Sequence, residues 1–538
     1  MASEIKALVF DLGGVLLEWD RHSLTVLSPG QFLTIMNSTT WHDLDRGMLT
    51  VKEACKDFGV ILGVEPSIVE SALEEAQLSL SVNVPLVQTI HDLKALNPDL
   101  ELYVMSNISR EHYKMVRNLD LPWSIFNSIF ISGVEGMRKP DLCFFRHAIK
   151  QIGIDPSQIV MIDDTVENIC AARSLGMYGL LADDKAAKTG STLLNLLQDP
   201  LPRAEAYLKN NARNHHCVTE GHENLILKDN FAQMMIWEFT GDESLIYFKW
   251  PSGKLHGTSV GDSINGQTNG SNGSSINSDV KNGLWNYFYE KPVLTSRDFP
   301  PDADTTATAY LSLPPEYLSM VADVELVLDA MATNVDSDGI MQTYFASDRP
   351  RTSPEVCCNI LRLFYHFGHD SDTRIRKTEE WVVSCLKNNA CLNGNRYYST
   401  PESFLYFVVR LYMECSPGRL ANQLEVVVKE QLEERLNVPT NPLSLALRIF
   451  ACQLIGINEK LYRKDLRTLL SLQDRDGGWP AGHFCCVGKT GTRIGNRGLT
   501  TALAAKIIRK ERGVISWTFP DGKSPIRKFC VYRSILIG

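Results

Sequence analysis

Asp302 and Asp304 stand two positions apart in the run DADTT, and this pair suggests acid chemistry. Two close carboxylates do not both ionise easily in a poorly hydrated site, so one of them tends to keep its proton. A protonated carboxylic acid in an apolar cavity can protonate an alkene, which is a very weak base. The run also fits a helix start, because Asp is a good helix cap and two prolines precede it.

A second group of polar residues follows apolar runs in the first 210 residues. ALVF ends at Asp11, ELYVM ends at Ser106 and Asn107, and IVMI ends at Asp163 and Asp164. Helical patterns lie between or after these runs, so we expect a parallel α/β sheet. Ligands bind at the carboxyl edge of such sheets, where these residues would lie with Lys139 of GMRKPD.

In order and spacing, these segments resemble the four motifs of the haloacid-dehalogenase superfamily, whose usual members are magnesium-dependent phosphatases. The resemblance covers residues 1–200 and implies a Rossmann-like domain with a mostly helical cap at about 18–90. It makes Asp11 the nucleophile that forms an aspartyl-phosphate. It also implies a phosphate site at Ser106, Asn107 and Lys139, and a Mg²⁺ site at Asp11, Asp163, Asp164 and the backbone of Gly13.

Gly13 departs from the usual family pattern, in which a second Asp acts as general acid and base. Such a group contributes about 10²–10⁴-fold to the rate, so its loss leaves open an inactive phosphatase-like domain. A separate alternative is that DDTVE, from Asp163 to Glu167, is the DDxxE metal motif of class I terpene synthases. The strand before it favours the phosphatase motif, because class I enzymes carry DDxxE on a helix.

From about residue 283 the sequence has helical periodicity, with helix pairs recurring every 40–50 residues as in an α/α barrel. The run QDRDGGW resembles the structural Q-x-x-D-G-x-W repeat of squalene cyclases, and DxDTT resembles the protonation motif of class II terpene cyclases. MQTYFASDRPRTSPEVCCNIL and NGNRYYSTPESFLYFVVRL further resemble a fungal and bacterial family that joins a haloacid-dehalogenase-like domain to a class II cyclase β-domain. Its members make drimane-type sesquiterpenes.

This resemblance implies that Asp304 protonates the terminal alkene of farnesyl diphosphate while Asp302 orients or polarises it. Two ring closures and a deprotonation give a bicyclic drimane-type diphosphate, which the first domain would convert to drimenol or albicanol. Arg349, Arg351 or Arg396 would hold the diphosphate. The expected substrate contacts also include Thr305 and Thr306 of the motif and the aromatic residues Trp285, Tyr344, Phe345 and Tyr398, with Trp479 either a contact or purely structural.

We therefore expect a phosphatase domain at 1–210 and a cyclase domain at 211–538. A run rich in Gly, Ser and Asn at about 255–282 predicts a disordered loop within the second domain. The three residues His215, His216 and His222 have no convincing partner spacing for a metal site.

The composition limits the other functions. A formal charge of −9 gives no reason to expect nucleic-acid binding. No apolar run reaches the roughly 20 residues of a membrane span, and the N-terminus lacks a signal-peptide pattern. With 13 scattered cysteines, we expect reduced thiols in a cytoplasmic protein. Two alternatives are a cyclase with a silent first domain and a phosphatase with a helical interaction domain. The oligomeric state and the choice between a drimenyl and an albicanyl product stay open.

Overall fold

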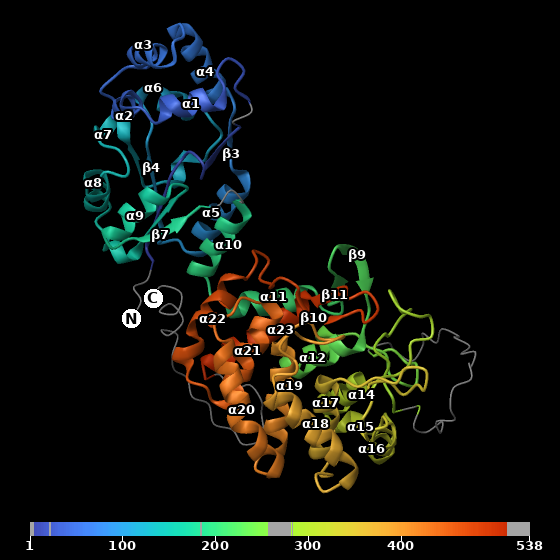
Figure 1. The fold of residues 1–538 in the computed structure, drawn as a ribbon. Coiled ribbons are helices and arrows are strands. Elements are labelled where there is room, and N and C mark those ends of the chain that lie inside the picture. Colours follow the sequence, from blue (N-terminus) through green and yellow to red (C-terminus); the bar gives the residue numbers. More distant parts are fainter. Residues whose placement is uncertain (1–4, 21–22, 183–185, 257–280, 282, 514–538) are drawn as a thin grey trace. The chain divides into compact units, whose positions relative to one another are not determined.

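The computed structural model describes residues 5–20, 23–182, 186–256, 281 and 283–513. Within them the chain divides into two compact units between Gln198 and Asp199 (Figure 1). This division lies earlier than the expected boundary at 210/211, because α11 (Pro200–Asn210) packs against α23 (Arg497–Glu511) of the second unit. Most of the predicted loop at 255–282 lies outside the described residues.

The first unit contains a five-stranded parallel sheet with the order β5-β4-β1-β6-β7. The predicted strands are confirmed as β1 (Ala7–Phe10), β4 (Glu101–Ser106) and β6 (Ile159–Asp163). β5 (Ser128–Ile131) and β7 (Tyr178–Leu181) were not predicted. The central strands are apolar except at their ends, because both faces of the sheet are buried.

Helices cover both faces of this sheet. Leu8 and Phe10 of β1 pack in one hydrophobic cluster with α5 (Val84–Leu96) and α10 (Ala186–Leu197). Ala7 and Val9 point to the other face, toward α8 (Leu142–Ile152) and α9 (Val166–Ser174). Two shorter helices, α6 (Arg110–Val116) and α7 (Ser132–Glu135), flank β5 in the chain.

A helical cap is inserted between β2 (Leu17–Trp19) and β3 (Leu80–Val82), which pair antiparallel. Its hydrophobic core includes Phe32, Phe58 and Leu73. The cap ends before α5, whose apolar residues belong to the core of the sheet, so the expected range of 18–90 is too long at its C-terminal end. The cap helices are α1 (Pro29–Met36), α2 (Thr39–Asp45), α3 (Val51–Leu62) and α4 (Pro66–Leu78).

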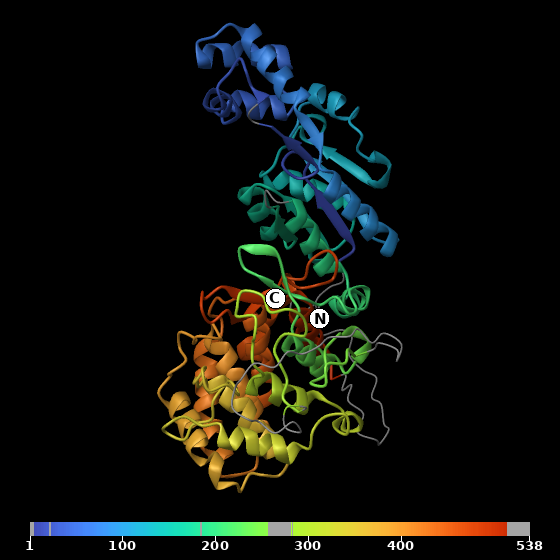
Figure 2. The same cartoon turned by 90° about the vertical axis from the view of Figure 1, so that its right-hand side faces the viewer.

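The second unit is built on a closed ring of inner helices. Figure 2 shows this unit from a second direction. Each inner helix contacts the next, and α23 closes the ring against α12, so the predicted α/α barrel is confirmed. The inner helices are buried nearly all round, as the core of a barrel requires. They are α12 (Asn230–Thr240), α14 (Ala303–Ser312), α17 (Pro354–His366), α19 (Pro401–Cys415), α21 (Pro442–Ile455) and α23.

Outer helices pack against this ring with one apolar face each. In α22 (Glu459–Ser471) the apolar residues Leu466, Leu469 and Leu470 are buried, while charged residues occupy much of the rest of the helix. The other helices outside the ring are α11, α15 (Pro315–Leu318), α16 (Val324–Thr333), α18 (Arg376–Lys387) and α20 (Arg419–Arg435). No helix in the described part of the chain is both long and apolar enough to cross a membrane.

An antiparallel sheet that was not predicted completes the second unit. Its order is β10-β11-β8-β9, so strands from the two ends of the unit pair with each other. The strands are β8 (Cys217–Thr219), β9 (His222–Leu227), β10 (Gly482–Cys486) and β11 (Arg493–Asn496).

The QDRDGGW run has the structural role that its resemblance implies. Gln473 donates from Nε2 to the carbonyls of Pro200 (2.9 Å) and Gly477 (2.8 Å). Trp479 is fully buried and donates from Nε1 to the carbonyl of Leu469 (2.6 Å). These bonds tie the end of α22 to the beginning of the unit.

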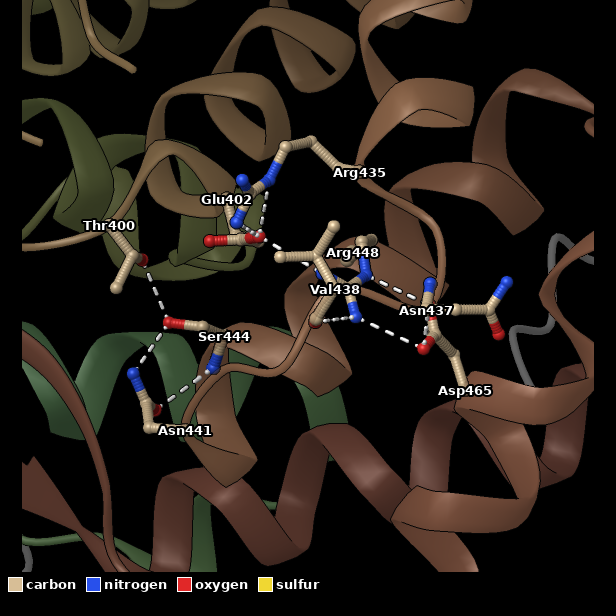
Figure 3. Close-up of polar contacts among 9 residues, drawn as sticks. All are labelled: Thr400, Glu402, Arg435, Asn437, Val438, Asn441, Ser444, Arg448 and Asp465. Carbon is tan, nitrogen blue, oxygen red and sulfur yellow. Dashed lines mark hydrogen bonds and ion pairs between the residues drawn. The ribbon is translucent and has the colours of Figure 1, made fainter. Parts of the chain in front are cut away.

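Arg448 of α21 joins three segments of the barrel (Figure 3). Its guanidinium donates to Glu402 (3.0 Å), to both carboxylate oxygens of Asp465 (2.9 and 3.0 Å) and to the carbonyl of Val438 (2.9 Å). Arg448 is 1% exposed and Glu402 is fully buried. Because Glu402 lies in the first turn of α19, this contact fixes the helix start that follows the loop 395–400.

We expect Arg448→Met to lower the free energy of unfolding by about 3–5 kcal/mol, because the buried carboxylates of Glu402 and Asp465 would lose their shared cation. Urea unfolding followed by circular dichroism would measure this loss. The half-buried surface pair Arg463–Glu459 provides the control, since Arg463→Met should cost no more than about 1 kcal/mol. Equal losses in the two variants would contradict this role of Arg448.

Two candidate active sites

The first candidate site lies where three neighbouring strands end. Asp11 follows β1, while Ser106 ends β4 and Asp163 ends β6. The strands β4, β1 and β6 are adjacent and parallel, so their carboxyl ends meet at one edge of the sheet. All three side chains are buried, with exposures of 9% or less. The structure therefore brings together the polar residues that the sequence placed after apolar runs.

Lys139 supplies a buried positive charge to this site. Its Nζ lies 2.9 Å from Oδ2 of Asp11 and also forms an ion pair with Asp163. Burial alone would lower the pKa of Lys139, but the two carboxylates outweigh it and raise the pKa. Asn107 exchanges two hydrogen bonds of 2.8 Å with the backbone of Lys139 and so fixes this loop.

Three carboxylates of the first site fit a divalent cation. One oxygen each from Asp11, Asp163 and Asp164 lie within 4.8 Å of one another. Carboxylate oxygens are the ligands that Mg²⁺ prefers. Oδ1 of Asp163 accepts hydrogen bonds from Thr165 N and Asn168 Nδ2, both at 2.9 Å, which holds this carboxylate in place. Burial raises the pKa of Asp11 to about 7, although Lys139 lowers it.

At Gly13 there is room for the side chain of the second Asp that most members of the superfamily carry at this position. A Cβ atom built on Gly13 meets nothing within 4 Å, and its φ is not in the left-handed region. Gly14 differs, because its φ is +71° and a Cβ there would lie 2.1 Å from Oδ2 of Asp164. The geometry therefore tolerates a side chain at Gly13 but not at Gly14. The metal contact expected from the backbone of Gly13 remains a prediction.

We expect Gly13→Asp to raise phosphatase turnover at least about tenfold, because the new carboxyl would protonate the leaving group and then activate water. Turnover would be measured as phosphate release from a phosphate monoester. Gly14→Ala is the matched variant, and it should lose activity because its methyl group would displace Asp164. A rate unchanged or lowered by Gly13→Asp would mean that a missing acid does not limit this site.

The second candidate site is a cavity of about 860 Å³ at the end of the barrel where the inner helices begin. Asp302, Asp304 and Thr305 of α14 line it, as do Val356 near the start of α17 and Tyr398 before α19. The end of β10 and the loop that follows it contribute further wall residues at 485–490.

Asp302 is the N-cap of α14, as expected from the interpretation of the run DADTT as a helix start. Its two carboxylate oxygens accept from the backbone N (2.7 Å) and the hydroxyl (2.9 Å) of Thr305. The cap also faces the cavity, so both interpretations of DxDTT apply to Asp302. Burial and, to a smaller extent, the nearby Asp304 raise the pKa of Asp302 to about 8, against the hydrogen bonds from Thr305 that lower it.

Asp304 is held by two side chains from other elements. Asn359 of α17 donates from Nδ2 to Oδ1 of Asp304 (2.8 Å), and the Tyr398 hydroxyl donates to Oδ2. Burial raises the pKa of Asp304 to about 6, although these two donors lower it. Asp304 is thus a buried, oriented acid in the wall of a large cavity.

The structure brings some of the predicted contact residues to the cavity and leaves others out. Tyr344, Arg351, Arg396 and Tyr398 line it with Thr305. Aromatic lining residues that sequence reasoning missed are Phe231, Tyr287, Phe288, Phe299 and Tyr397.

Four predicted contacts lie outside the lining. Trp285 is fully buried beside Phe248, with ring centroids 5.7 Å apart, so its prediction as a substrate contact is corrected. The Thr306 hydroxyl accepts from Trp285 N (2.9 Å) and has a structural role. Phe345 does not reach the cavity, and neither does Trp479.

Cations gather where the cavity meets solvent. Arg351, Arg396 and Lys489 are exposed and line it, and no ion pair to them is found in the described part of the chain. Arg349 also lines the cavity, with its guanidinium carbon 5.1 Å from the ring centroid of Phe299. Among the described lining residues, the only acids are Asp302 and Asp304, which are buried. The cavity is therefore acidic where it is buried and basic where it is open.

Comparisons with known proteins match each unit separately and the chain as a whole. Residues 5–176 match the haloacid dehalogenase-like hydrolase family, and residues 201–367 match the "Sesquiterpene cyclase astC-like C-terminal domain". "Drimenol cyclase drtB" of Aspergillus calidoustus is 35% identical over 94% of this chain and 88% of that protein.

Two further similarities concern the first unit alone. "Sesquiterpene phosphatase astK" of Aspergillus oryzae is 33% identical over 35% of this chain and 94% of that protein. The magnesium complex of a haloacid-dehalogenase-family enzyme from Bacteroides thetaiotaomicron is 23% identical, with a TM-score of 0.29, over 34% of this chain and 96% of that one.

Proposed function

Because the chain belongs to the family of haloacid-dehalogenase-like drimane terpene cyclases, we propose that it converts farnesyl diphosphate into a bicyclic drimane-type alcohol. It is an enzyme with a cyclase unit and a phosphatase-type unit, and its relatives imply an isoprenoid diphosphate as substrate. The choice of farnesyl diphosphate among these rests on the chemistry of the cavity and on the drimane skeleton of the family.

The observation that carries the proposal is the environment of Asp304, a buried carboxyl that accepts hydrogen bonds from Asn359 and Tyr398 in an aromatic cavity. In its protonated form Asp304 transfers the proton to the terminal alkene. The two following alkenes attack the cations in turn and close two rings. Loss of one proton from the bicyclic cation balances the proton gained, so the step is an isomerisation with the diphosphate intact.

The lining of the cavity supports both ends of such a substrate. The faces of Tyr287, Phe299 and Tyr344 stabilise passing cations through their quadrupoles, by about 0.5–2 kcal/mol each. The exposed guanidinium groups of Arg351 and Arg396 offer planar sets of donors to the diphosphate. An apolar chain thus lies toward the buried acid while its anionic end stays near solvent.

The first unit provides the dephosphorylation. In a first round Asp11 attacks the terminal phosphorus, the bond to the bridging oxygen breaks to leave the monophosphate, and water hydrolyses the aspartyl-phosphate to release phosphate and restore Asp11. A second round on the monophosphate breaks the bond between phosphorus and the alcohol oxygen, and so gives the free alcohol and a second phosphate. Lys139 and Ser106 bind the phosphoryl oxygens. The carboxylates of Asp11, Asp163 and Asp164 would hold Mg²⁺, which offsets the repulsion between an anionic nucleophile and an anionic phosphate when bound.

Similarity to a sesquiterpene phosphatase favours an active first unit over a cyclase with a silent domain. A direct test is incubation with farnesyl diphosphate and Mg²⁺, followed by extraction with and without added alkaline phosphatase. We expect a bicyclic alcohol in the direct extract. If it forms only after added phosphatase, the first unit is silent, and if no bicyclic product forms at all, the proposed cyclisation is wrong.

A further inference from the structure

Asn359 is a buried polar residue of α17 that lies outside the DxDTT motif and contacts its acid. It is fully buried on an inner helix whose residues are buried from Pro354 to Phe364. A buried amide is costly unless both of its ends are hydrogen-bonded. Its Nδ2 donates to Oδ1 of Asp304 (2.8 Å), and its Oδ1 accepts from Nη1 of Arg362 (3.1 Å).

Arg362 settles the orientation of this amide. A guanidinium only donates hydrogen bonds, so the atom of Asn359 that faces Arg362 must be the oxygen. The amide nitrogen therefore faces Asp304. Arg362 is itself 3% exposed, and its Nη2 lies 3.5 Å from Oε1 of Glu238 on α12, which also pairs with Arg410. Arg362, Glu238 and Arg410 thus form a charged network that holds the amide group of Asn359 in place.

This orientation determines which oxygen of Asp304 can carry a proton. A proton on Oδ1 would face the amide protons of Asn359, which would place two donors against each other. Oδ2 is compatible with either protonation state, because the Tyr398 hydroxyl can both donate and accept. After transfer, the carboxylate accepts from both neighbours, and this stabilises the anion that the reaction leaves behind.

The same helix also supports the second partner of the acid. Glu355, four residues before Asn359, accepts at Oε2 from Ser353 (2.9 Å) and from Asn395. Oδ1 of Asn395 accepts from the backbone N of Tyr397 (2.7 Å) and of Tyr398 (2.9 Å). α17 therefore holds Asn359 directly and the Tyr398 loop through Glu355.

We propose that Asn359, oriented by Arg362, is a positioning residue that confines the transferable proton of Asp304 to Oδ2 and stabilises the carboxylate after transfer. This inference rests on the proposed function, because it assumes that Asp304 is the proton donor. Asn359 does not line the cavity, so its effect should fall on kcat and not on KM.

The pH dependence of cyclisation tests this role. A donor must be protonated, so the rate falls as the pH rises through its pKa. The hydrogen bond from Asn359 lowers the pKa of Asp304, so its loss should raise that pKa. The alkaline limb of the pH–rate profile should then move to higher pH. The other charged or titratable groups near Asp304 are Asp302 on its own helix, Glu355 and Arg362 on α17, Tyr398 and Cys485.

The experiment compares wild type with Asn359→Leu and Asn359→Asp. We expect kcat to fall about 10–100-fold in both, with an alkaline limb at higher pH and an unchanged KM. Asn359→Asp pairs with Arg362 and keeps the test valid if Asn359→Leu does not fold. Cys358→Ala, a buried change on the same helix, should keep the wild-type limb.

Two results would overturn the inference. One is an alkaline limb at the same pH in both Asn359 variants as in wild type, in an assay where wild type forms the bicyclic product and Asp304→Asn does not. The other is loss of the alkaline limb of the pH–rate profile in Glu355→Gln. This result would assign the alkaline limb to Glu355, because burial raises the pKa of that residue to about 7. Failure of the proposed function looks different, because wild type would then form no bicyclic product or Asp304→Asn would still form it.

Discussion

Asp304→Asn should lower formation of any bicyclic product by a factor of at least about 10², while the variant stays folded. The substitution keeps the shape of the side chain and removes the transferable proton. Asp302, the other acid among the described lining residues, should not replace it, because both of its carboxylate oxygens accept hydrogen bonds from Thr305 at the helix cap. Product would be measured by gas chromatography and mass spectrometry after added alkaline phosphatase, so that a lost first unit does not hide cyclisation.

The exposed residue Asp338 provides the matched control, since Asp338→Asn removes a carboxylate from the same unit away from the cavity. It should retain wild-type yield. Release of phosphate from a simple monoester by Asp304→Asn should also equal that of wild type, because the acid belongs to the second unit. Bicyclic product from Asp304→Asn at more than a tenth of the wild-type rate would refute its role as proton donor.

Asp11→Asn should abolish release of the free alcohol, by a factor on the order of 10³ or more, and leave cyclisation unchanged. An amide cannot form the aspartyl-phosphate, and it also removes one of the three carboxylates suited to Mg²⁺. The bicyclic product should then accumulate as its diphosphate. Direct extraction, compared with extraction after added alkaline phosphatase, separates the two forms.

Asp120→Asn, a change at an exposed carboxylate of the first unit, is the control and should release alcohol as wild type does. Removal of Mg²⁺ with a chelator should reproduce the Asp11→Asn result. Alcohol in the direct extract of Asp11→Asn would show that another group, or another site, breaks the phosphate bond.

The site of the first unit could be predicted from the sequence because its acids and Ser106 occupy or directly follow strands with recognisable apolar runs. Adjacent parallel strands then had to bring Asp11, Ser106 and Asp163 to one edge. Lys139 lies on a loop, and its place beside Asp11 came from the order of motifs alone. β5 and β7 are no shorter than β1, but neither carries or precedes one of the motif residues that identified the other strands, so both were missed.

The second site could be predicted only around its motif. Asn359 lies in the run CCNILRL, where nothing local distinguishes it from a tolerated polar residue, and only the packing of α17 against α14 brings it to Asp304. Trp285 was chosen by residue type, but in the fold it belongs to an aromatic core with Phe248 and Trp250. Burial against other rings, which sequence does not reveal, decides which aromatics meet a ligand.

The contrast between the buried acids and the exposed cations of the second cavity sets an order of events for a substrate bound as we propose. Asp304 is 8% exposed, whereas Arg351, Arg396 and Lys489 lie at the solvent side. The hydrocarbon tail must enter first and the diphosphate last. The compact bicyclic product leaves in the opposite order, with its diphosphate first, so the diphosphate reaches solvent while the rings are still inside the cavity. During release, the diphosphate group that a phosphatase hydrolyses therefore becomes accessible before the rings do.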